Sequence, residues 1–353
     1  MVSDQFSVGL IGVGYWGPNY VRLISRNDRL RLKLVCDKDP SRFGEKGVKK
    51  SGASFSTDPL EAMKADVDVI VLSTPASTHY ELCRKALERG KHVLVEKPLA
   101  LSTEEAKELF WLARSRGVVL MAGLVYLYNA AVKHVVNHIR GRTVLHSTYL
   151  RTGLGPVRSD VNCVWDLAIH DFALSCLFTS EFPETVWGMG AKLLGPSEDV
   201  AVVWLQYKKS VSTIKVSWLD PLKRREISLV TERDMIVFDD VDAFEPIRIY
   251  ERGVETKKPE EESTPFKFYV KNGPVYIPYV EYGEPLEKQL ERFVERVDQK
   301  QIPFTWEDQI ALRSVAMAEA VNQSIGQNGK IVKPVDPVAT YAVPEDGGKV
   351  SRV

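Results

Sequence analysis

The stretch FSVGLIGVGYWG, residues 6–17, decides the fold. The apolar run Phe6–Ile11 leads directly into a GxGxxG motif made by Gly12, Gly14 and Gly17, and a segment of helical period follows. Three glycines in a loop are a weak signal alone, but a preceding strand and a following helix are the context in which this motif binds a dinucleotide. Gly12 permits the tight turn, Gly14 lets the backbone approach a diphosphate, and Gly17 lets helix and strand pack closely. The diphosphate is then expected at the helix N-terminus.

Asp37 follows the next apolar run, twenty residues beyond Gly17. A carboxylate there accepts hydrogen bonds from the adenosine ribose hydroxyls and repels a 2′-phosphate, so we predict NAD in preference to NADP. Lys38 and Arg42 lie close enough in sequence to soften this preference. The alternative, a structural glycine turn with a solvated Asp37, stays open at this point.

Around this motif the first half of the chain alternates strands and helices. Short apolar runs at 32–36, 67–72, 92–95 and 118–121 have the near-continuous character of buried parallel strands. Segments of helical period separate them, at 15–26, 59–64, 77–89 and 102–116. This alternation predicts a doubly wound, mostly parallel sheet, and we assign residues 1–124 to an α/β Rossmann domain.

The second half has a different period. Residues 211–218 alternate apolar and polar side chains, which is typical of a sheet with one solvated face. We predict an α+β domain over 125–330, with a largely antiparallel sheet covered by helices on one face. Its expected helices span 129–139, 164–178, 287–299 and 306–324, and an exposed excursion spans 253–285. Residues 331–353 are expected to form a tail that is partly disordered or docked on a neighbour.

Composition bounds the function. The chain has 353 residues, 44% of them hydrophobic and 27% charged, and a formal net charge of zero. No global field therefore favours nucleic acid or an anionic membrane. The four cysteines are far apart and form no CxxC pair, which favours reduced thiols over disulfides or a zinc site. The N-terminus lacks a basic leader and no apolar run reaches the ~20 residues of a membrane span, so we expect a cytoplasmic protein.

Two further patterns carry candidate chemistry. Lys97 lies in a Glu-Lys-Pro triplet after the run 92–95, at the carboxyl end of a predicted strand, where open α/β sheets bind ligands. Asp166 and His170 are four residues apart on a predicted helix, so they share one face, and an imidazole beside a carboxylate is a natural acceptor for an alcohol proton. An exposed loop lysine and a capped helix with a satisfied histidine remain the alternatives.

No metal site is predicted. His134 and His138 have the same spacing as two zinc ligands on one helix face, but the residues between them, Val135, Val136 and Asn137, include no glutamate of the zinc-protease type.

Together, the glycine motif, residues 73–79, the Glu-Lys-Pro triplet and the Asp-xxx-His pair resemble the Gfo/Idh/MocA oxidoreductases over roughly residues 6–325. The resemblance implies catalytic roles for Lys97, Asp166 and His170, and a cis peptide bond between Lys97 and Pro98. It does not decide whether Lys97 or His170 is the base. The predicted cofactor site comprises Gly12, Gly14, Tyr15, Trp16, Gly17, Asp37, Ser73, Thr74, Pro75, His79, Glu96 and Lys97.

A narrower likeness concerns the substrate. Residues 14–19, 126–129 and 157–162 resemble the family branch that acts on nucleotide sugars, which implies oxidation of the 3-hydroxyl of a UDP-N-acetylhexosamine or its uronate. Arg158 can clamp a diphosphate or carboxylate, and Asn162 can read a sugar hydroxyl or amide. The predicted substrate site comprises Lys97, Tyr128, Asn129, Arg158, Asn162, Asp166 and His170.

Other functions stay open beside this one. The branch often has a histidine after the sixth strand, where this chain has Gly123, Leu124, Val125 and Tyr126, so any role of that histidine is not carried over. A free-sugar or inositol dehydrogenase and a non-catalytic dinucleotide-binding regulator are the alternatives. The family usually pairs its second-domain sheets between subunits, so a homodimer or homotetramer is expected.

Overall fold

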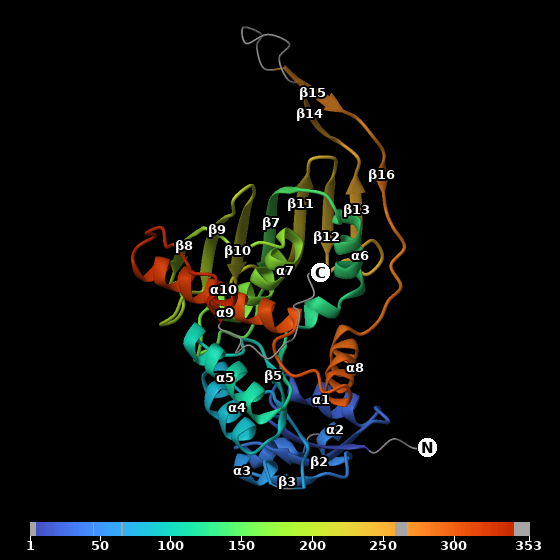
Figure 1. Ribbon diagram of the computed structural model, residues 1–353, viewed down its shortest axis with the longest axis vertical. Helices are drawn as coiled ribbons and strands as arrows, with labels where there is room; N and C mark the ends of the chain where they lie inside the picture. The colour runs from blue at the N-terminus through green and yellow to red at the C-terminus, as the bar shows by residue number, and fades with distance from the viewer. Residues whose placement is uncertain (1–4, 45, 65, 258–266, 342–353) are drawn as a thin grey trace.

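The computed structural model describes residues 5–44, 46–64, 66–257 and 267–341. Two sheets lie one above the other in Figure 1, the N-terminal sheet in blue to teal and the C-terminal sheet in green to orange. No helix in these ranges combines the length and apolar composition that a membrane span needs. All four cysteines are free and buried.

The N-terminal sheet is entirely parallel, with strand order β3-β2-β1-β4-β5-β6. Its strands are β1 (Phe6–Ile11), β2 (Leu30–Cys36), β3 (Ser54–Ser56), β4 (Val69–Leu72), β5 (His92–Glu96) and β6 (Leu120–Gly123). The order reverses between β1 and β4, which makes the carboxyl ends of these strands the expected ligand site. The doubly wound architecture is confirmed, and of these strands only the short, exposed edge strand β3 was not predicted.

Helices cover both faces of this sheet: α1 (Gly17–Ile24), α2 (Lys46–Lys49), α3 (Pro59–Ala62), α4 (His79–Glu88) and α5 (Thr103–Arg116), with 3-10 turns at Pro40–Gly44 and Ala76–Thr78. Helix α5 shows how local sequence sets the ends of an element. The Ser102 hydroxyl accepts a hydrogen bond from the Glu105 N–H, and Gly117 ends the helix in the left-handed region at φ 67°.

The C-terminal sheet has the order β16-β13-β12-β11-β7-β10-β9-β8 and is antiparallel except for the parallel pair β10–β7. Its strands are β7 (Val144–Thr152), β8 (Thr185–Ala191), β9 (Val200–Gln206), β10 (Val211–Ser217), β11 (Arg224–Thr231), β12 (Met235–Asp239), β13 (Ile247–Tyr250) and β16 (Val275–Tyr276). Strands β14 (Gly253–Lys257) and β15 (Lys267–Lys271) form a separate hairpin that projects from the body (Figure 1), within the predicted excursion.

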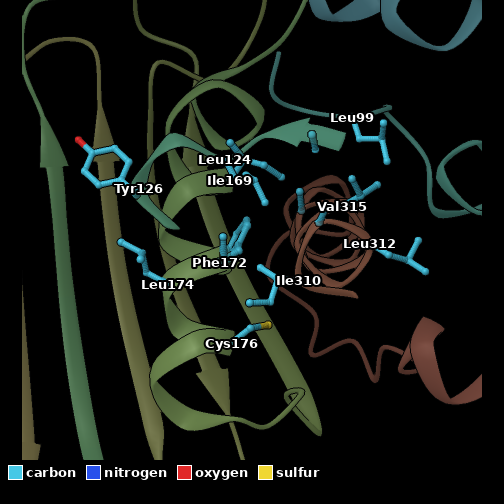
Figure 2. Close-up of a cluster of buried hydrophobic side chains, with 14 of the residues drawn as sticks. Leu99, Leu124, Tyr126, Ile169, Phe172, Leu174, Cys176, Ile310, Leu312 and Val315 are labelled. Carbon is cyan, nitrogen blue, oxygen red and sulfur yellow. The ribbon is translucent and has the colours of Figure 1, made fainter. Parts of the chain in front are cut away.

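One continuous core runs from the face of the N-terminal sheet that α4 and α5 cover to the C-terminal sheet. On the C-terminal sheet it lies under three helices, α6 (Ala130–Ile139), α7 (Ile169–Thr179) and α9 (Trp306–Gly326). As the alternation in β10 predicts, Ile214, Val216 and the following Trp218 are buried. Helix α7 packs against α9, and Figure 2 shows Phe172 and Ile310 between the two helices.

Helix α8 (Pro285–Asp298) falls within the predicted second domain but packs in the core of the first. Its apolar side chains, among them Leu290 and Phe293, join the cluster that contains Val8 of β1 and Val21 of α1. Helical period shows that a helix has one apolar face, but it does not show which sheet that face covers.

The last described residues are docked on the second domain. Val332 forms an isolated antiparallel bridge with Val186, the short helix α10 spans Pro337–Thr340, and the ring of Tyr341 stacks on Phe304 with centroids 4.5 Å apart. The rest of the predicted tail, 342–353, lies outside the described residues.

Candidate active site

The three glycines of the first loop have distinct structural roles. Gly12 has φ +94°, and a Cβ at this position would collide with the carbonyl oxygen of Ser73 on the loop after β4. A Cβ at Gly17 would collide with the carbonyl oxygen of Gly12. Gly14 is different, because a Cβ there would meet no atom within 4 Å. The backbone at Gly14 therefore borders open space that a ligand can occupy.

The surroundings of this space suit a dinucleotide. Trp16 occupies the N-cap of α1 without a side-chain cap, and the first turn contains no acidic residue, so N–H groups and the helix dipole favour an anion. The Asp37 carboxylate lies after β2 and accepts hydrogen bonds from the N–H groups of Val13 (2.8 Å) and Asp39 (3.0 Å). Tyr15, in the same loop, is largely exposed. These residues fit NAD, whose diphosphate would bind at α1 and whose adenosine ribose would bind at Asp37.

His79 belongs to the support of the site. It is almost fully buried, and its ring nitrogens lie 2.7 Å from the Pro98 carbonyl oxygen and 2.9 Å from that of Thr74. Burial lowers the pKa of His79, so the ring is neutral and donates to one of the two oxygens. His79 thus lies between the Ser73-Thr74-Pro75 loop and the loop that carries Lys97, and it bonds to one of them.

Lys97 and Asp166 form the centre of the site. The Lys97 Nζ lies 2.9 Å from Asp166 Oδ1 and 2.6 Å from the Asp166 carbonyl oxygen. The Lys97–Pro98 peptide bond is cis, as the resemblance implies. Two side chains that are 69 positions apart in the sequence meet where β5 ends below the second domain.

Asp166 has two further partners. Arg158 donates from Nε to Oδ1 at 2.7 Å, and the Trp218 indole donates to Oδ2 at 3.1 Å. Burial raises the pKa of the Asp166 carboxyl, but the charges of Lys97 and Arg158 outweigh this effect and hold the pKa below its usual range. The carboxylate is therefore ionised and fixes the Lys97 ammonium group.

The expected pairing of Asp166 with His170 is wrong. Residues Val164–Ala168 form a π-helical turn before α7, so the four-residue spacing does not stack these side chains as an α-helix would. No hydrogen bond joins the two within the described ranges, and Nδ1 of His170 is buried without a partner.

His170 is instead held by packing. Its ring makes an edge contact with Tyr126, with centroids 5.0 Å apart. Burial, followed by the charges of Lys97, Arg151 and Arg225, lowers the pKa of His170 well below its usual range. The ring is therefore neutral at physiological pH.

Comparison with known proteins agrees with this geometry. The family model GFO_IDH_MocA, described as "Oxidoreductase family, NAD-binding Rossmann fold", matches residues 6–124. Through residues 6–124, the N-terminal domain of this chain belongs to the Gfo/Idh/MocA oxidoreductases.

Similar members of this family act on sugars or related polyols. UDP-N-acetylglucosamine 3-dehydrogenase of Acidithiobacillus ferrooxidans is 29% identical over 197 residues, 56% of this chain and 62% of that protein. The scyllo-inositol 2-dehydrogenase (NAD(+)) of Bacillus subtilis is 28% identical over 214 residues, 55% of this chain and 60% of that protein. The matched region thus spans less than two thirds of either relative.

Solved structures extend the likeness to both domains. The Acidithiobacillus enzyme, GnnA, has a TM-score of 0.77 at 22% identity and covers 92% of this chain and 98% of its own. GenD2 from gentamicin A biosynthesis, solved in complex with NAD, has a TM-score of 0.77 at 22% identity and covers 94% and 97%. At this identity these structures show that the whole fold is shared.

A buried network behind His170 escaped the sequence interpretation. Arg151 pairs with Asp171 through contacts of 2.7 to 3.1 Å and donates to the Tyr126 hydroxyl at 2.9 Å. Tyr126 in turn donates to Asp240 at 2.7 Å. No sequence pattern predicted this network, because the burial of Arg151 on β7, which requires a carboxylate partner, is seen only in the structure.

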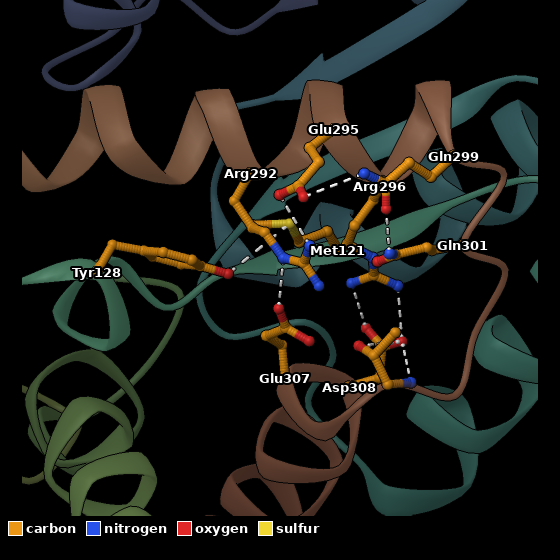
Figure 3. Close-up of polar contacts among 10 residues, drawn as sticks. Met121, Tyr128, Arg292, Glu295, Arg296, Gln299, Gln301, Glu307 and Asp308 are labelled. Carbon is orange, nitrogen blue, oxygen red and sulfur yellow. Dashed lines mark hydrogen bonds and ion pairs between the residues drawn. The ribbon is translucent and has the colours of Figure 1, made fainter. Parts of the chain in front are cut away.

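Three predicted substrate residues have partners within the fold. Asn129 caps α6 and donates to Asp240 (3.2 Å), and Asn162 donates to Glu198 (2.8 Å) and Asn322 (2.6 Å). The Tyr128 hydroxyl points toward the Met121 sulfur, at 3.9 Å, beside the ion pairs that join α8 to α9 (Figure 3). Within the described residues Tyr128 makes no hydrogen bond with Lys97, Asp166 or His170. Beside Lys97, Asp166 and His170 themselves, Arg158 is the predicted substrate residue whose side chain bonds to this cluster in the described part of the chain.

Proposed function

We propose that this chain is an NAD-dependent dehydrogenase that oxidises a secondary hydroxyl group of a sugar. The observation that carries the proposal is the meeting of the Lys97–Asp166 ion pair with an unpaired, neutral His170, where β5 ends and beside the dinucleotide loop. A cation and a base near one point are what the oxidation of an alcohol requires.

His170, Lys97 and Asp166 have separate roles in the proposed oxidation. When bound, NAD supplies the carbon that accepts a hydride. His170 takes the hydroxyl proton at Nε2 while the carbon–hydrogen electron pair leaves as hydride, and a carbonyl group forms. The Lys97 ammonium donates a hydrogen bond to the oxygen as negative charge develops on it, and Asp166 holds Lys97 in position. Because Lys97 is paired with an ionised carboxylate, His170 is the better candidate for the base.

For the substrate we propose a nucleotide sugar, a UDP-N-acetylhexosamine or its uronate, oxidised at C3. Arg158 uses its Nε for Asp166, and its two terminal amino groups have no partner in the described part of the chain, so they can bind a phosphate or carboxylate. The similarity to UDP-N-acetylglucosamine 3-dehydrogenase supports this choice. The similarity to scyllo-inositol 2-dehydrogenase (NAD(+)) supports the alternative, an enzyme of free sugars or inositols.

The test is NADH formation on a panel of UDP-N-acetylhexosamines, their uronates, free sugars and inositols. We expect turnover on the UDP-linked compounds, loss of turnover in His170→Asn, and wild-type turnover in the control His134→Asn on α6. Turnover on free compounds alone selects the alternative substrate class. NAD binding with no turnover on any compound supports the non-catalytic regulator instead.

We also propose that the chain forms a homodimer or homotetramer through its C-terminal sheet. Met189, Val202 and Trp204 are all more than 40% exposed, and Met189 and Val202 are cross-strand partners. In β9 the alternate residues Ala201, Val203 and Leu205 are buried, so the exposed ones lie on the sheet face away from the helices. Burial of this face against a second copy removes apolar surface from water.

A further inference from the structure

Two fully buried polar side chains lie behind the loop that carries Lys97. Gln289 of α8 donates a hydrogen bond from Nε2 to the Tyr20 hydroxyl of α1 at 3.1 Å, and Tyr20 donates to Glu96 Oε1 at 2.7 Å. Both Tyr20 and Gln289 have 0% exposure. Burial of polar groups without hydrogen bonds costs free energy, so two polar side chains at this depth indicate a specific role.

The direction of these bonds is fixed. The Gln289 amide nitrogen has no lone pair to offer, so it is the donor and the Tyr20 oxygen is the acceptor. The single Tyr20 proton is then directed to Glu96. Bonds in such a chain strengthen one another in a dry environment. Gln289 thereby keeps Tyr20 a donor to the Glu96 carboxylate.

Glu96 lies at the last position of β5, directly before Lys97. Its other neighbours are the backbone N–H of Lys97, 3.3 Å from Oε2, the Lys97 charge, the Trp16 side chain, and Gly123 of β6, where a Cβ would lie 3.1 Å from the Glu96 Cα. Burial raises the pKa of Glu96, and the Tyr20 hydrogen bond followed by the Lys97 charge opposes this rise.

We propose that Tyr20 and Gln289 are positioning residues that hold Glu96 as an ionised acceptor for the nicotinamide end of NAD. The inference rests on the proposed function, since it needs NAD at this site. The ribose hydroxyls and the carboxamide of that end are hydrogen-bond donors, and a carboxylate accepts from them where a protonated carboxyl loses acceptor capacity. Helix α8, which reaches the first domain from the far end of the chain, thereby takes part in cofactor binding.

The test is the affinity for NAD, measured by fluorescence titration from weakly acidic to weakly alkaline pH. In the wild type the dissociation constant rises toward acid pH as Glu96 takes up a proton. Tyr20→Phe removes one donor to the carboxylate, so this rise begins about one pH unit higher and the affinity falls roughly tenfold in that range. At alkaline pH, where Glu96 is ionised in both proteins, the affinities converge. Gln289→Met shifts the profile in the same direction by less.

The controls separate positioning from general damage. Tyr207→Phe removes another fully buried hydroxyl, one that bonds to Ser175, and is expected to leave the profile unchanged. Glu96→Gln should abolish the acid limb, and adding Tyr20→Phe to it should produce no further shift. If Tyr20→Phe does not fold, Gln289→Met carries the test.

A pH-independent loss of affinity, or no change in either variant, would overturn the inference. Wild-type protein that binds NAD but oxidises no sugar overturns the proposed function and leaves this inference standing. Wild-type protein that does not bind NAD overturns both.

Discussion

The candidate cofactor loop and the candidate catalytic cluster of this protein are built in opposite ways. The loop takes Gly12, Gly14 and Gly17 from one strand–turn–helix unit and adds Asp37 from the next strand. The catalytic cluster takes Lys97, Arg158, Asp166 and Trp218 from four separate segments of two domains. A local site is determined by residues that are close in the sequence, whereas an assembled site depends on how two sheets and their helices pack.

The largest expected effect comes from a substitution in the catalytic cluster, which is assembled from distant segments. His170→Asn should lower turnover by about 10²–10⁴-fold while NAD affinity stays at the wild-type level, because the base acts only in the chemical step. The pKa of His170 is held well below its usual range, so wild-type turnover at saturating NAD should be constant across neutral pH. It should fall only as the pH drops through that lowered pKa, where the ring takes up a proton. Steady-state rates and calorimetry check this, and wild-type turnover in the variant would remove His170 from the mechanism.

Two glycine variants test the cofactor loop, whose residues are close together in the sequence. Gly12→Ala places a Cβ against a backbone oxygen at φ +94°, so the free energy of unfolding should fall by about 3 kcal/mol. Gly14→Ala meets open space, so its stability should stay within about 0.5 kcal/mol of the wild type while NAD affinity drops. Chemical denaturation and NAD titration separate the two. Equal stability losses would contradict the distinct roles assigned to these glycines.

The third prediction concerns the proposed subunit interface, which lies on the C-terminal sheet and is separate from the cofactor loop. Trp204→Arg should weaken self-association by about 2 kcal/mol, roughly 30-fold in the dissociation constant, because a central tryptophan is a typical interface hot spot. Lys209→Ala, in an exposed turn, is the matched control. Light scattering over a concentration series provides the measurement, and a monomeric wild type at micromolar concentration would refute the interface.

The smallest effect concerns Asp37. Asp37→Ala should narrow the preference for NAD over NADP by roughly tenfold, about 1.4 kcal/mol, because the carboxylate that repels a 2′-phosphate is gone. Thermal stability should be measured beside affinity, since the variant also leaves the Val13 N–H without its acceptor. Equal affinity of the wild-type protein for the two cofactors would contradict the assignment.

The difference between the two regions also explains where sequence interpretation succeeded. The Rossmann domain was predictable because its strands, glycine turn and helix ends are set by neighbouring residues, as the Ser102 cap of α5 illustrates. The Asp166–His170 pairing was wrong because a π-helical turn changes which side chains share a face. No periodic pattern in the sequence predicts that turn.

The sequence by itself determined the parallel dinucleotide-binding sheet, the alternating faces of the second sheet, and the identity of Lys97, Asp166 and His170 as candidates. Only the tertiary structure decided that Asp166 pairs with Lys97, Arg158 and Trp218, that Tyr126 packs against His170, and that α8 returns to the first domain to reach Tyr20. The physical reason is range. Backbone conformation, caps and amphipathic faces depend on residues a few positions apart, whereas the partner of a buried charge is whichever group the packing of distant elements brings within hydrogen-bonding distance.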